Sequence, residues 1–227
     1  MRPVLAIRPE PGLAATLAAG RAAGLEMIGA PLFAIRPRAW TPPPARGFDA
    51  LLIGSANALR HAGPGLAAFA HLPVLAVGEA TAAHARAAGF TIGAQGAGGL
   101  QAVLDSLRGA AGPRHLLRLA GEEHVALAAP PQVRIETRIV YAAEPQPLEP
   151  DAAAAIAGGA VVLLHSAAAA RQFASECDRL ALPRARLALA ALGPRVLEAA
   201  GIGWAALACA AQPAEPALLA LARDLCQ

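Results

Sequence analysis

The sequence predicts an α/β protein of two doubly wound domains, each with a parallel sheet covered by helices on both faces. A unit of short apolar strand, polar or glycine-containing turn, alanine-rich helix and closing glycine recurs along the 227 residues. Such alternation is typical of βαβ units. Two proline-rich segments divide the chain, which suggests more than one domain. The composition, 56% hydrophobic and 15% charged, is sufficient for real cores.

The individual elements follow in order along the chain. An apolar strand, PVLAI, opens it, and Leu13 and Leu17 then lie four positions apart on one face of a helix that ends at Gly24. Further strand, turn and helix units are predicted at LLIGSANAL, VLAVGEATAAHARAAGF, VVLLHSAAA and LALAALGPRVLEAAGI. In the last unit Gly193-Pro194 forms the turn and Gly201 the helix stop.

Residues 35–48 and 141–150 are proline-rich and are predicted to be extended, because proline lacks a donor for a strand ladder. The first segment leaves an N-terminal piece of about 35 residues, below the roughly 40 that an unaided core needs. That piece must pack elsewhere. We therefore expect two flavodoxin-like domains joined by a two-segment linker, the first of them discontinuous: residues 1–36 with 147–227, residues 41–137, and linkers at 37–40 and 138–146.

Composition and charge argue against several function classes. The net charge is +3, and no basic run or aromatic-interleaved basic patch is present, so nucleic acid is not an expected partner. All 19 basic residues are arginine, which reflects either a GC-rich genome or a polyacidic ligand. Three isolated cysteines and six histidines without an i, i+4 pair argue against a disulfide framework and a metal site.

Targeting signals are not recognisable. The N-terminal stretch MRPVLAIRPEPG is too short and too interrupted by charge for a signal peptide. Residues 152–170 contain no Asp, Glu, Lys or Arg, but their apolar content is mostly alanine and Gly158-Gly159 stands in the middle. Helix, turn and strand is therefore a better interpretation than a membrane span. We expect a cytoplasmic monomer with no membrane partner.

The strands lack nucleotide and hydrolase motifs: no G-x-G-x-x-G fingerprint, P-loop or G-x-S-x-G is present, and no cofactor is expected. What remains is a set of turns at the carboxyl ends of predicted strands, where open α/β sheets bind ligands. Glycine admits a close ligand and helix-start N–H groups favour anions, so turns facing one cleft would bind a carboxylate-rich molecule. The candidate binding residues are Arg8, Ser55, Ala56, Asn57, Gly78, Ala80, Thr81, Gly121, His165, Ser166, Ala167, Gly193 and Arg195. For serine, threonine and asparagine, ordinary helix capping is the alternative.

Tyr141 is the only tyrosine and ends the alternating strand VRIETRIVY beside the second predicted linker. A tyrosine in such a position is commonly a structural plug with a solvated hydroxyl. Its place between the predicted domains also makes it a candidate for a chemical step.

In order and spacing, a series of motifs resembles the uroporphyrinogen-III synthase family over essentially the whole chain: RPEP, PLFAI, GSANAL, AVGEATAAHARAAGF, AGEE, IVY, LLHSAAAA and AAQPAEPALLAL. The resemblance implies two α/β domains and a cofactor-free, cyclising hydro-lyase of tetrapyrrole (haem, chlorophyll or cobalamin) biosynthesis. Its substrate would be hydroxymethylbilane, a carboxylate-rich linear tetrapyrrole that loses water and closes with inversion of ring D to give uroporphyrinogen III. Free bilane closes to the wrong isomer, so the enzyme would assist hydroxyl departure and hold the productive conformation.

The resemblance also implies roles for particular residues. Tyr141 would assist departure of the hydroxyl group. The family's T-S-x-N-A, G-x-A-T and S-P-S turns are matched by Ser55, Asn57 and Ala58, by Gly78, Ala80 and Thr81, and by Ser166.

Several positions depart from the family pattern. Gly54 stands where the first turn usually has threonine, and Ala167 and Ala168 replace proline and serine in the last turn. The stretch LRLAGEE differs from the usual L-P-R-G-E and leaves the role of Arg118 open. LGPRVLEAAGI lacks the family's threonine pair and predicts a helix about one turn shorter. Arg195 either supplies a carboxylate contact there or leaves the site weaker.

Two alternatives to a synthase remain. A non-catalytic protein of the same architecture would bind tetrapyrroles or another polyacid, since the altered turns remove family hydroxyls. A two-domain transferase would need a cosubstrate site that the sequence does not reveal.

Overall fold

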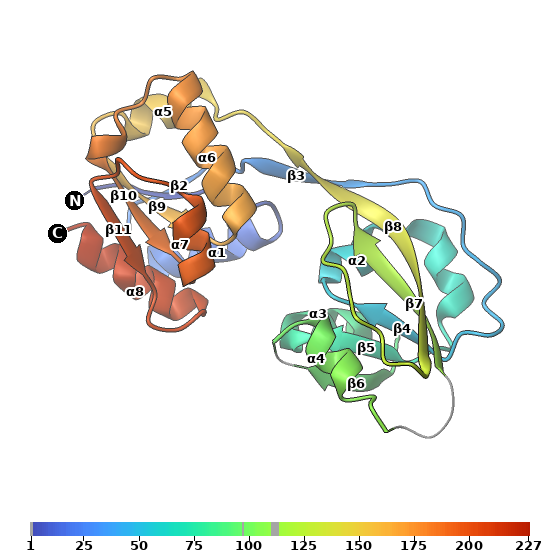
Figure 1. Cartoon of the computed structure of the whole chain (residues 1–227). Helices are drawn as coiled ribbons and strands as arrows, with labels where there is room; N and C mark the ends of the chain where they lie inside the picture. Colours follow the sequence, from blue (N-terminus) through green and yellow to red (C-terminus); the bar gives the residue numbers. More distant parts are fainter. Residues whose placement is uncertain (1, 97, 110–113) are drawn as a thin grey trace. The chain divides into compact units, whose positions relative to one another are not determined.

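The computed structural model describes residues 2–96, 98–109 and 114–227, and it divides into two compact units (Figure 1). Unit 1 combines Met1–Ala34 with Glu144–Gln227, and unit 2 is Ile35–Ala143. The chain therefore passes between the units twice. Across the described residues, no helix is long and apolar enough to cross a membrane.

Unit 1 alternates strands and helices around a sheet with the order β11-β10-β9-β1-β2, in which each neighbouring pair is parallel. Numbered within the unit this is 2-1-3-4-5, the flavodoxin order, whose switch point lies between β1 and β9. Its elements are β1 (Val4–Ala6), α1 (Gly12–Ala22), β2 (Met27–Gly29), α5 (Pro150–Ile156), β9 (Ala160–Leu164), α6 (Ala167–Arg179), η2 (Arg184–Arg186), β10 (Leu187–Ala191), α7 (Pro194–Ala199), β11 (Ala206–Cys209) and α8 (Glu215–Leu225).

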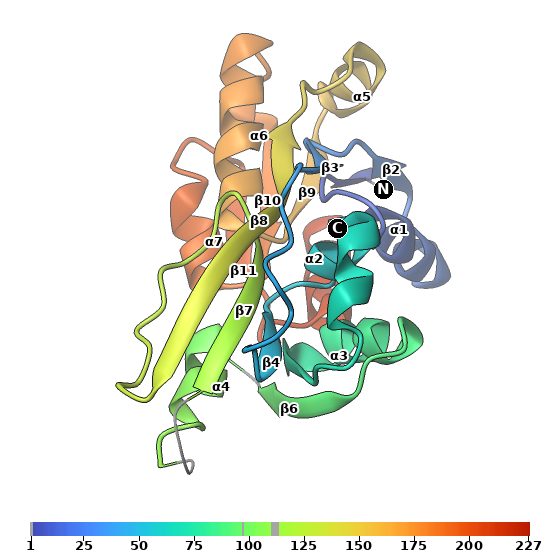
Figure 2. The same cartoon turned by 90° about the vertical axis from the view of Figure 1, so that its right-hand side faces the viewer.

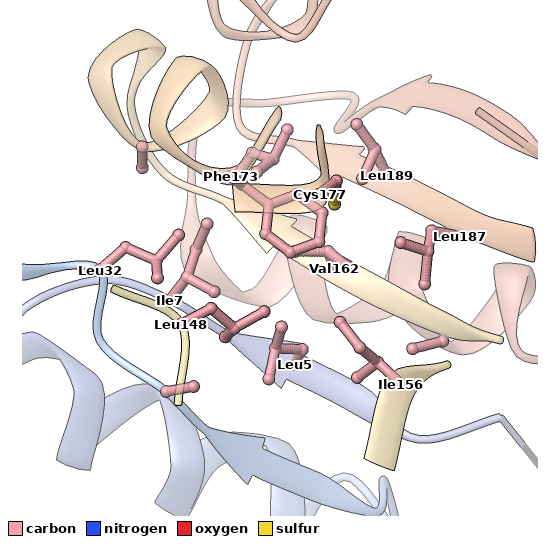
Figure 3. Packing of buried hydrophobic residues seen from close by; sticks show 14 of the residues in the cluster. Leu5, Ile7, Leu32, Leu148, Ile156, Val162, Phe173, Cys177, Leu187 and Leu189 are labelled. Carbon is pink, nitrogen blue, oxygen red and sulfur yellow. The ribbon is translucent and has the colours of Figure 1, made fainter. Parts of the chain in front are cut away.

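The strands of unit 1 are buried on both faces, which explains their continuous apolar sequences. Leu5 and Val162 point to the face covered by α5, α6 and α7, where Phe173 is fully buried (Figure 3). Their neighbours Val4 and Val161 point to the opposite face, covered by α1 and α8. Side chains alternate along a strand, so one short apolar run supplies both cores.

Unit 2 contains a sheet with the order β3-β8-β7-β4-β5-β6, and the pairs from β8 through β6 are parallel. If β4 is counted as the first strand of this unit, the strands from β6 to β8 follow the order 3-2-1-4-5. We expected the flavodoxin order, 2-1-3-4-5, in both domains, but only unit 1 has it. The switch point of unit 2 lies between β4 and β7. Its elements are β3 (Phe33–Pro37), β4 (Ala50–Ile53), α2 (Ala56–His61), η1 (Gly63–Phe69), β5 (Val74–Val77), α3 (Gly78–Ala87), β6 (Ile92–Gly96), α4 (Leu100–Asp105), β7 (Arg114–Gly121) and β8 (Val133–Pro145).

The sheet of unit 2 also separates two cores. Leu51, Leu117 and Leu119 face α2, η1 and α3, whereas Leu52 and Leu116 face α4. In Figure 2, β7 and β8 run side by side, in agreement with their pairing from Arg114 to Gly121. The carboxyl ends of β4, β5, β7 and β8 therefore meet at one edge of the sheet.

The second predicted linker is largely strand, whereas the first contains only the last residue of a strand. Of the segment 138–146, all but the last residue belongs to β8, and Tyr141 pairs with Gly121 inside the sheet. The prolines that suggested a linker stand at or after the end of β8, so the alternating stretch before them is free to pair. The segment 37–40 begins with the last residue of β3, and the Arg38 N–H donates to the Val140 carbonyl at 2.9 Å.

Candidate active site

The predicted site residues lie in two groups, one at the carboxyl edge of each sheet. Unit 1 carries Arg8, His165, Ser166, Ala167, Gly193 and Arg195, and unit 2 carries Ser55, Ala56, Asn57, Gly78, Ala80, Thr81, Gly121 and Tyr141.

The switch point of unit 1 brings together two predicted residues and two that the sequence did not single out. Arg8 follows β1 and His165 follows β9, and these strands are neighbours. Glu215, the first residue of α8, accepts hydrogen bonds from the Thr16 hydroxyl (2.6 Å), His165 Nε2 (2.9 Å) and Arg8 Nη1 (3.2 Å). One carboxylate thus connects α1, α8 and the turns after both switch-point strands.

The charge on Glu215 is maintained by its hydrogen-bond donors. Burial acts to raise the pKa of Glu215, but the hydrogen bonds from His165 and Thr16 and the positive charge of Arg8 lower it overall. His165 is nearly buried, with 9% of its side chain exposed, and its Nδ1 has no hydrogen-bond partner among the described residues. The side chain of Arg8 remains 34% exposed.

Ser166, Gly193 and Arg195 stand at the starts of helices in unit 1. Ser166 is the N-cap of α6, where its Oγ accepts from the Ala169 N–H at 3.1 Å. Ala167 is the first residue of that helix. Gly193 precedes α7, which begins at Pro194. Arg195 is exposed and makes no hydrogen bond or ion pair within the part of the chain that the structure describes.

Capping also accounts for the turn after β4 in unit 2. Ser55 is the N-cap of α2, and its Oγ accepts from the Asn57 N–H at 3.2 Å. Asn57 in turn accepts from Arg60 at 3.0 Å. A serine Oγ that accepts one backbone bond still carries an O–H that can donate to a ligand. The capping role and a binding role are therefore compatible.

The turn after β5 begins α3. Gly78 has a φ of 72°, a left-handed conformation that favours glycine. Ala80 is exposed on the first turn of the helix, whereas Thr81 is buried with 6% exposure. Of these two residues, therefore, only Ala80 is open to solvent.

Tyr141 lies against the switch point of unit 2. Its ring packs directly on Gly121, where a Cβ would meet the Tyr141 ring and hydroxyl atoms at 2.7–2.9 Å. The Tyr141 carbonyl accepts from the Glu122 N–H at 2.9 Å, which fixes the backbone on both sides of the pair. The ring of His61 lies 6.4 Å away, centroid to centroid. The Tyr141 hydroxyl makes no hydrogen bond to any described residue, so it is available to a ligand.

The surroundings of Tyr141 include a buried cation, Arg118, and the imidazole of His61. Burial lowers the pKa of Arg118, and the interaction with Tyr141 partly opposes that decrease. Arg118 Nη1 donates to the Val125 carbonyl at 2.9 Å, so this side chain anchors the loop after β7. Burial lowers the pKa of both His61 and His84, and the charge of Arg60 lowers it further.

A family model described as uroporphyrinogen-III synthase HemD matches residues 14–220. The chain belongs to the uroporphyrinogen-III synthase family. The predicted resemblance is therefore confirmed. None of the curated proteins compared with the chain matches its sequence.

Two solved structures share this family's fold. The uroporphyrinogen-III synthetase of Helicobacter pylori 26695 has a TM-score of 0.66 at 17% identity, covering 99% of this chain and 100% of that chain. A mutant uroporphyrinogen III synthase of the extremely thermophilic bacterium Thermus thermophilus has a TM-score of 0.54 at 16% identity, covering 98% of each chain. These matches confirm the predicted α/β class with parallel sheets.

Unit 2 of this uroporphyrinogen-III synthase family member also has a cavity away from the predicted site residues. A cavity of about 800 Å³ in unit 2 is lined by Trp40, the prolines that follow it, His115 and Arg138, and none of the predicted site residues contributes to it. Within the described residues no group of three or more His, Cys, Asp or Glu side chains could hold a metal ion.

Sequence reasoning missed several residues of these clusters: Thr16, Arg60, His61, His84 and Glu215. Glu215 could have been selected, because it begins the helix after β11 and so stands at the same edge as the other turns. Thr16 lies inside α1 and carries no comparable signal.

Proposed function

We propose that this protein is a uroporphyrinogen-III synthase, which cyclises hydroxymethylbilane to uroporphyrinogen III with loss of water and inversion of ring D. It would act in tetrapyrrole biosynthesis as a cofactor-free hydro-lyase and a cytoplasmic monomer. Family membership supports the reaction. One observation carries the assignment of the chemical step: the Tyr141 hydroxyl has no hydrogen-bond partner among the described residues. Its ring packs on Gly121 beside the switch point of unit 2.

Tyr141 is the proposed general acid. The hydroxyl group of the bilane leaves as water when it receives a proton from Tyr141, and the pyrrole nitrogen supplies electrons to the breaking C–O bond. The substituted carbon of ring D then attacks the methylene carbon that carried the hydroxyl group, which gives a spiro intermediate. The bond from this ring carbon to the methylene bridge of ring C breaks, and the bridge carbon bonds to the free α-carbon of ring D, which inverts the ring. The proton that this α-carbon loses as the pyrrole is restored returns to the tyrosine. The positive charge of Arg118, which interacts with Tyr141, stabilises the phenolate between these steps.

The substrate carboxylates would be bound by the turns and by the accessible arginines. Arg8 and Arg195 present guanidinium groups at the edge of unit 1, and guanidinium pairs well with carboxylates. Ser55 and Ser166 can donate their hydroxyl protons while they cap α2 and α6. A substrate held at several such points is restricted to one closing geometry.

A coupled assay tests the proposal. Hydroxymethylbilane is generated by its upstream enzyme, this protein is added, and the oxidised porphyrins are separated by isomer. We expect the type III isomer from the wild type. Tyr141→Phe should lower kcat by about 10²-fold or more, the range of general acid catalysis, without changing the circular dichroism spectrum.

Ser106→Ala is the matched control, because it removes a hydroxyl at the end of α4 whose one hydrogen bond to a described residue goes to the Val103 carbonyl. Its turnover should equal that of the wild type. Full turnover by Tyr141→Phe would remove the tyrosine from the mechanism.

The second candidate is a non-catalytic tetrapyrrole- or polyacid-binding protein. The turn before α7 favours it, because Arg195-Val196 stands where family members often have a threonine pair. Type I product alone from a folded protein that binds uroporphyrin would establish this alternative.

A further inference from the structure

Glu215 occupies the centre of the unit 1 switch point but belongs to none of the turns considered for binding. Its three hydrogen bonds are unequal. The bonds from Thr16 and His165 are 2.6 and 2.9 Å long, whereas the bond from Arg8 Nη1 is 3.2 Å. The second contact of Arg8, to the Thr16 Oγ1, is 3.4 Å long. Glu215 is therefore held mainly by Thr16 and His165, and Arg8 is the most loosely held member.

Burial distinguishes the same partners. Thr16 is 1% exposed and the side chain of His165 is 9% exposed, so both belong to the interior of unit 1. The side chain of Arg8 is 34% exposed. A ligand that approaches from solvent therefore meets Arg8 before it meets the other donors.

Arg8 uses only part of its hydrogen-bonding capacity. Among the described residues it donates through Nη1 alone, which leaves Nε and Nη2 without a protein partner. Its guanidinium lies against Gly12, where a Cβ would be 2.5 Å from Nε. Because a guanidinium has five N–H donors, Arg8 can bind a carboxylate through nitrogens that Glu215 does not use.

We propose that Glu215 is a specificity-determining counter-ion, which pairs with Arg8, weakens the binding of small anions there and leaves the remaining N–H groups of Arg8 to a carboxylate of a polyacidic substrate. The proposal rests on the proposed function and identifies how one of its binding points selects its ligand. Even if the bond from Arg8 lengthens when a substrate binds, Glu215 keeps its bonds from Thr16 and His165, so this carboxylate does not lose all its donors.

The selection depends on the number of contacts that a ligand makes. A monocarboxylate gains only Arg8 and is repelled by Glu215, whereas a polyacid gains further contacts at other turns that offset this repulsion. Two unit charges about 6 Å apart on either side of one guanidinium repel enough to change an affinity by roughly tenfold at a partly exposed site. Neutralising Glu215 should therefore strengthen small-anion binding by about tenfold.

Acetate is the probe for the first experiment. Its affinity is measured by NMR chemical shift titration of the full chain in the wild type, Glu215→Gln and the double variant Arg8→Gln/Glu215→Gln. We expect Glu215→Gln to bind acetate about tenfold more tightly than the wild type, and the double variant to lose that gain. Asp178→Asn is the matched control, because it removes the same charge from an ion pair with Arg184 at the far end of α6, and its acetate affinity should not change. Unchanged or weaker acetate binding by Glu215→Gln would overturn the proposal.

The single variant Arg8→Gln keeps the proposal testable if Glu215→Gln does not fold. Because the charge of Glu215 already offsets that of Arg8 in the wild type, we expect Arg8→Gln to leave the weak binding of acetate nearly unchanged. The same variant should raise the KM for hydroxymethylbilane. Loss of acetate binding in Arg8→Gln would show that Arg8 is open to small anions and would contradict the role of Glu215.

These titrations require no turnover. Failure of the wild type to form type III product would reject the proposed function, whereas failure of the acetate prediction in an active enzyme would reject only the counter-ion role.

Discussion

The substitution Gly121→Ala tests whether the position of Tyr141, and not only its hydroxyl, matters for catalysis. The added methyl group would lie 2.7 Å from Cζ, 2.8 Å from Cε2 and 2.9 Å from the hydroxyl oxygen of Tyr141. These separations are well below van der Waals contact between carbon atoms, so the ring must move. The backbone of Gly121 does not have a positive φ, and alanine introduces no conformational strain there.

The size of the effect follows from that displacement. A ring that retreats by several tenths of an ångström to one ångström moves its hydroxyl by at least as much, and misplacement of about 1 Å can cost about 10²-fold in rate. Overpacking usually costs about 1–3 kcal/mol. The ring of Tyr141 is only half-buried and can swing toward solvent, so the stability cost should lie near the lower limit. We expect kcat to fall about 10- to 100-fold, with a loss of about 1 kcal/mol in the free energy of unfolding.

The coupled porphyrin assay and urea denaturation measure these two quantities on the same preparation. Gly158→Ala is the matched control, because it adds the same methyl group where, among the described residues other than its two chain neighbours, no atom lies within 4 Å. It should leave both quantities unchanged. Wild-type kcat in a folded Gly121→Ala protein would refute the argument that Gly121 sets the position of a catalytic tyrosine.

Two predictions concern ionisation. Burial raises the pKa of Cys177 to about 12, so a disulfide reagent at pH 8 should modify Cys177 only after unfolding, and mass spectrometry of the labelled peptides checks this against the half-buried Cys209. The pKa of Glu215 is lowered from 4.5, so its contribution to stability is complete above that value and is lost as the pH falls through the lower folded-state pKa. The difference in unfolding free energy between the wild type and Glu215→Gln should therefore decrease toward zero below about pH 4.5, and a pH-independent difference would exclude this linkage.

The elements of the fold were predictable because their sequence signals are local. The unit predicted at VLAVGEATAAHARAAGF is β5 followed by α3, and Gly24 and Gly201 have the positive φ values expected where helices stop. Buried parallel strands appear as short apolar runs, and an alanine-rich helix needs only a capped start and a glycine end. The strand order of unit 2 carries no such local signal, since it depends on which strand packs beside which.

The prolines gave a less reliable signal than the apolar runs. Pro145 and Pro147 suggested an extended linker, yet most of that segment is the end of β8. A strand and an extended linker have similar backbone dihedral angles, and only hydrogen bonds to a neighbouring strand distinguish them. The neighbour, β7, precedes the segment by more than a dozen residues, beyond the reach of a local pattern.

Residues of the candidate site were predictable only where they follow the carboxyl ends of strands, because ligands bind at that edge of an open α/β sheet. Residues after the strand ends could be selected, and the structure places Arg8 and His165 beside the unit 1 switch point and Ser55 and Gly121 beside that of unit 2. Contacts that cross the sequence could not be selected: Thr16 and Glu215 are 199 positions apart, and their hydroxyl and carboxylate meet at 2.6 Å.

The helix caps explain why serine at these turns was ambiguous in the sequence. Capping consumes a lone pair on the serine oxygen, whereas an anionic ligand needs the hydroxyl proton. Ser55 and Ser166 therefore serve α2 and α6 without losing the donor that a carboxylate would use. The cap also fixes that oxygen at the edge of the sheet, so the hydroxyl has only to rotate about its C–O bond to meet a ligand. Structural and binding roles at these two positions depend on one another, and substitution by alanine would remove both.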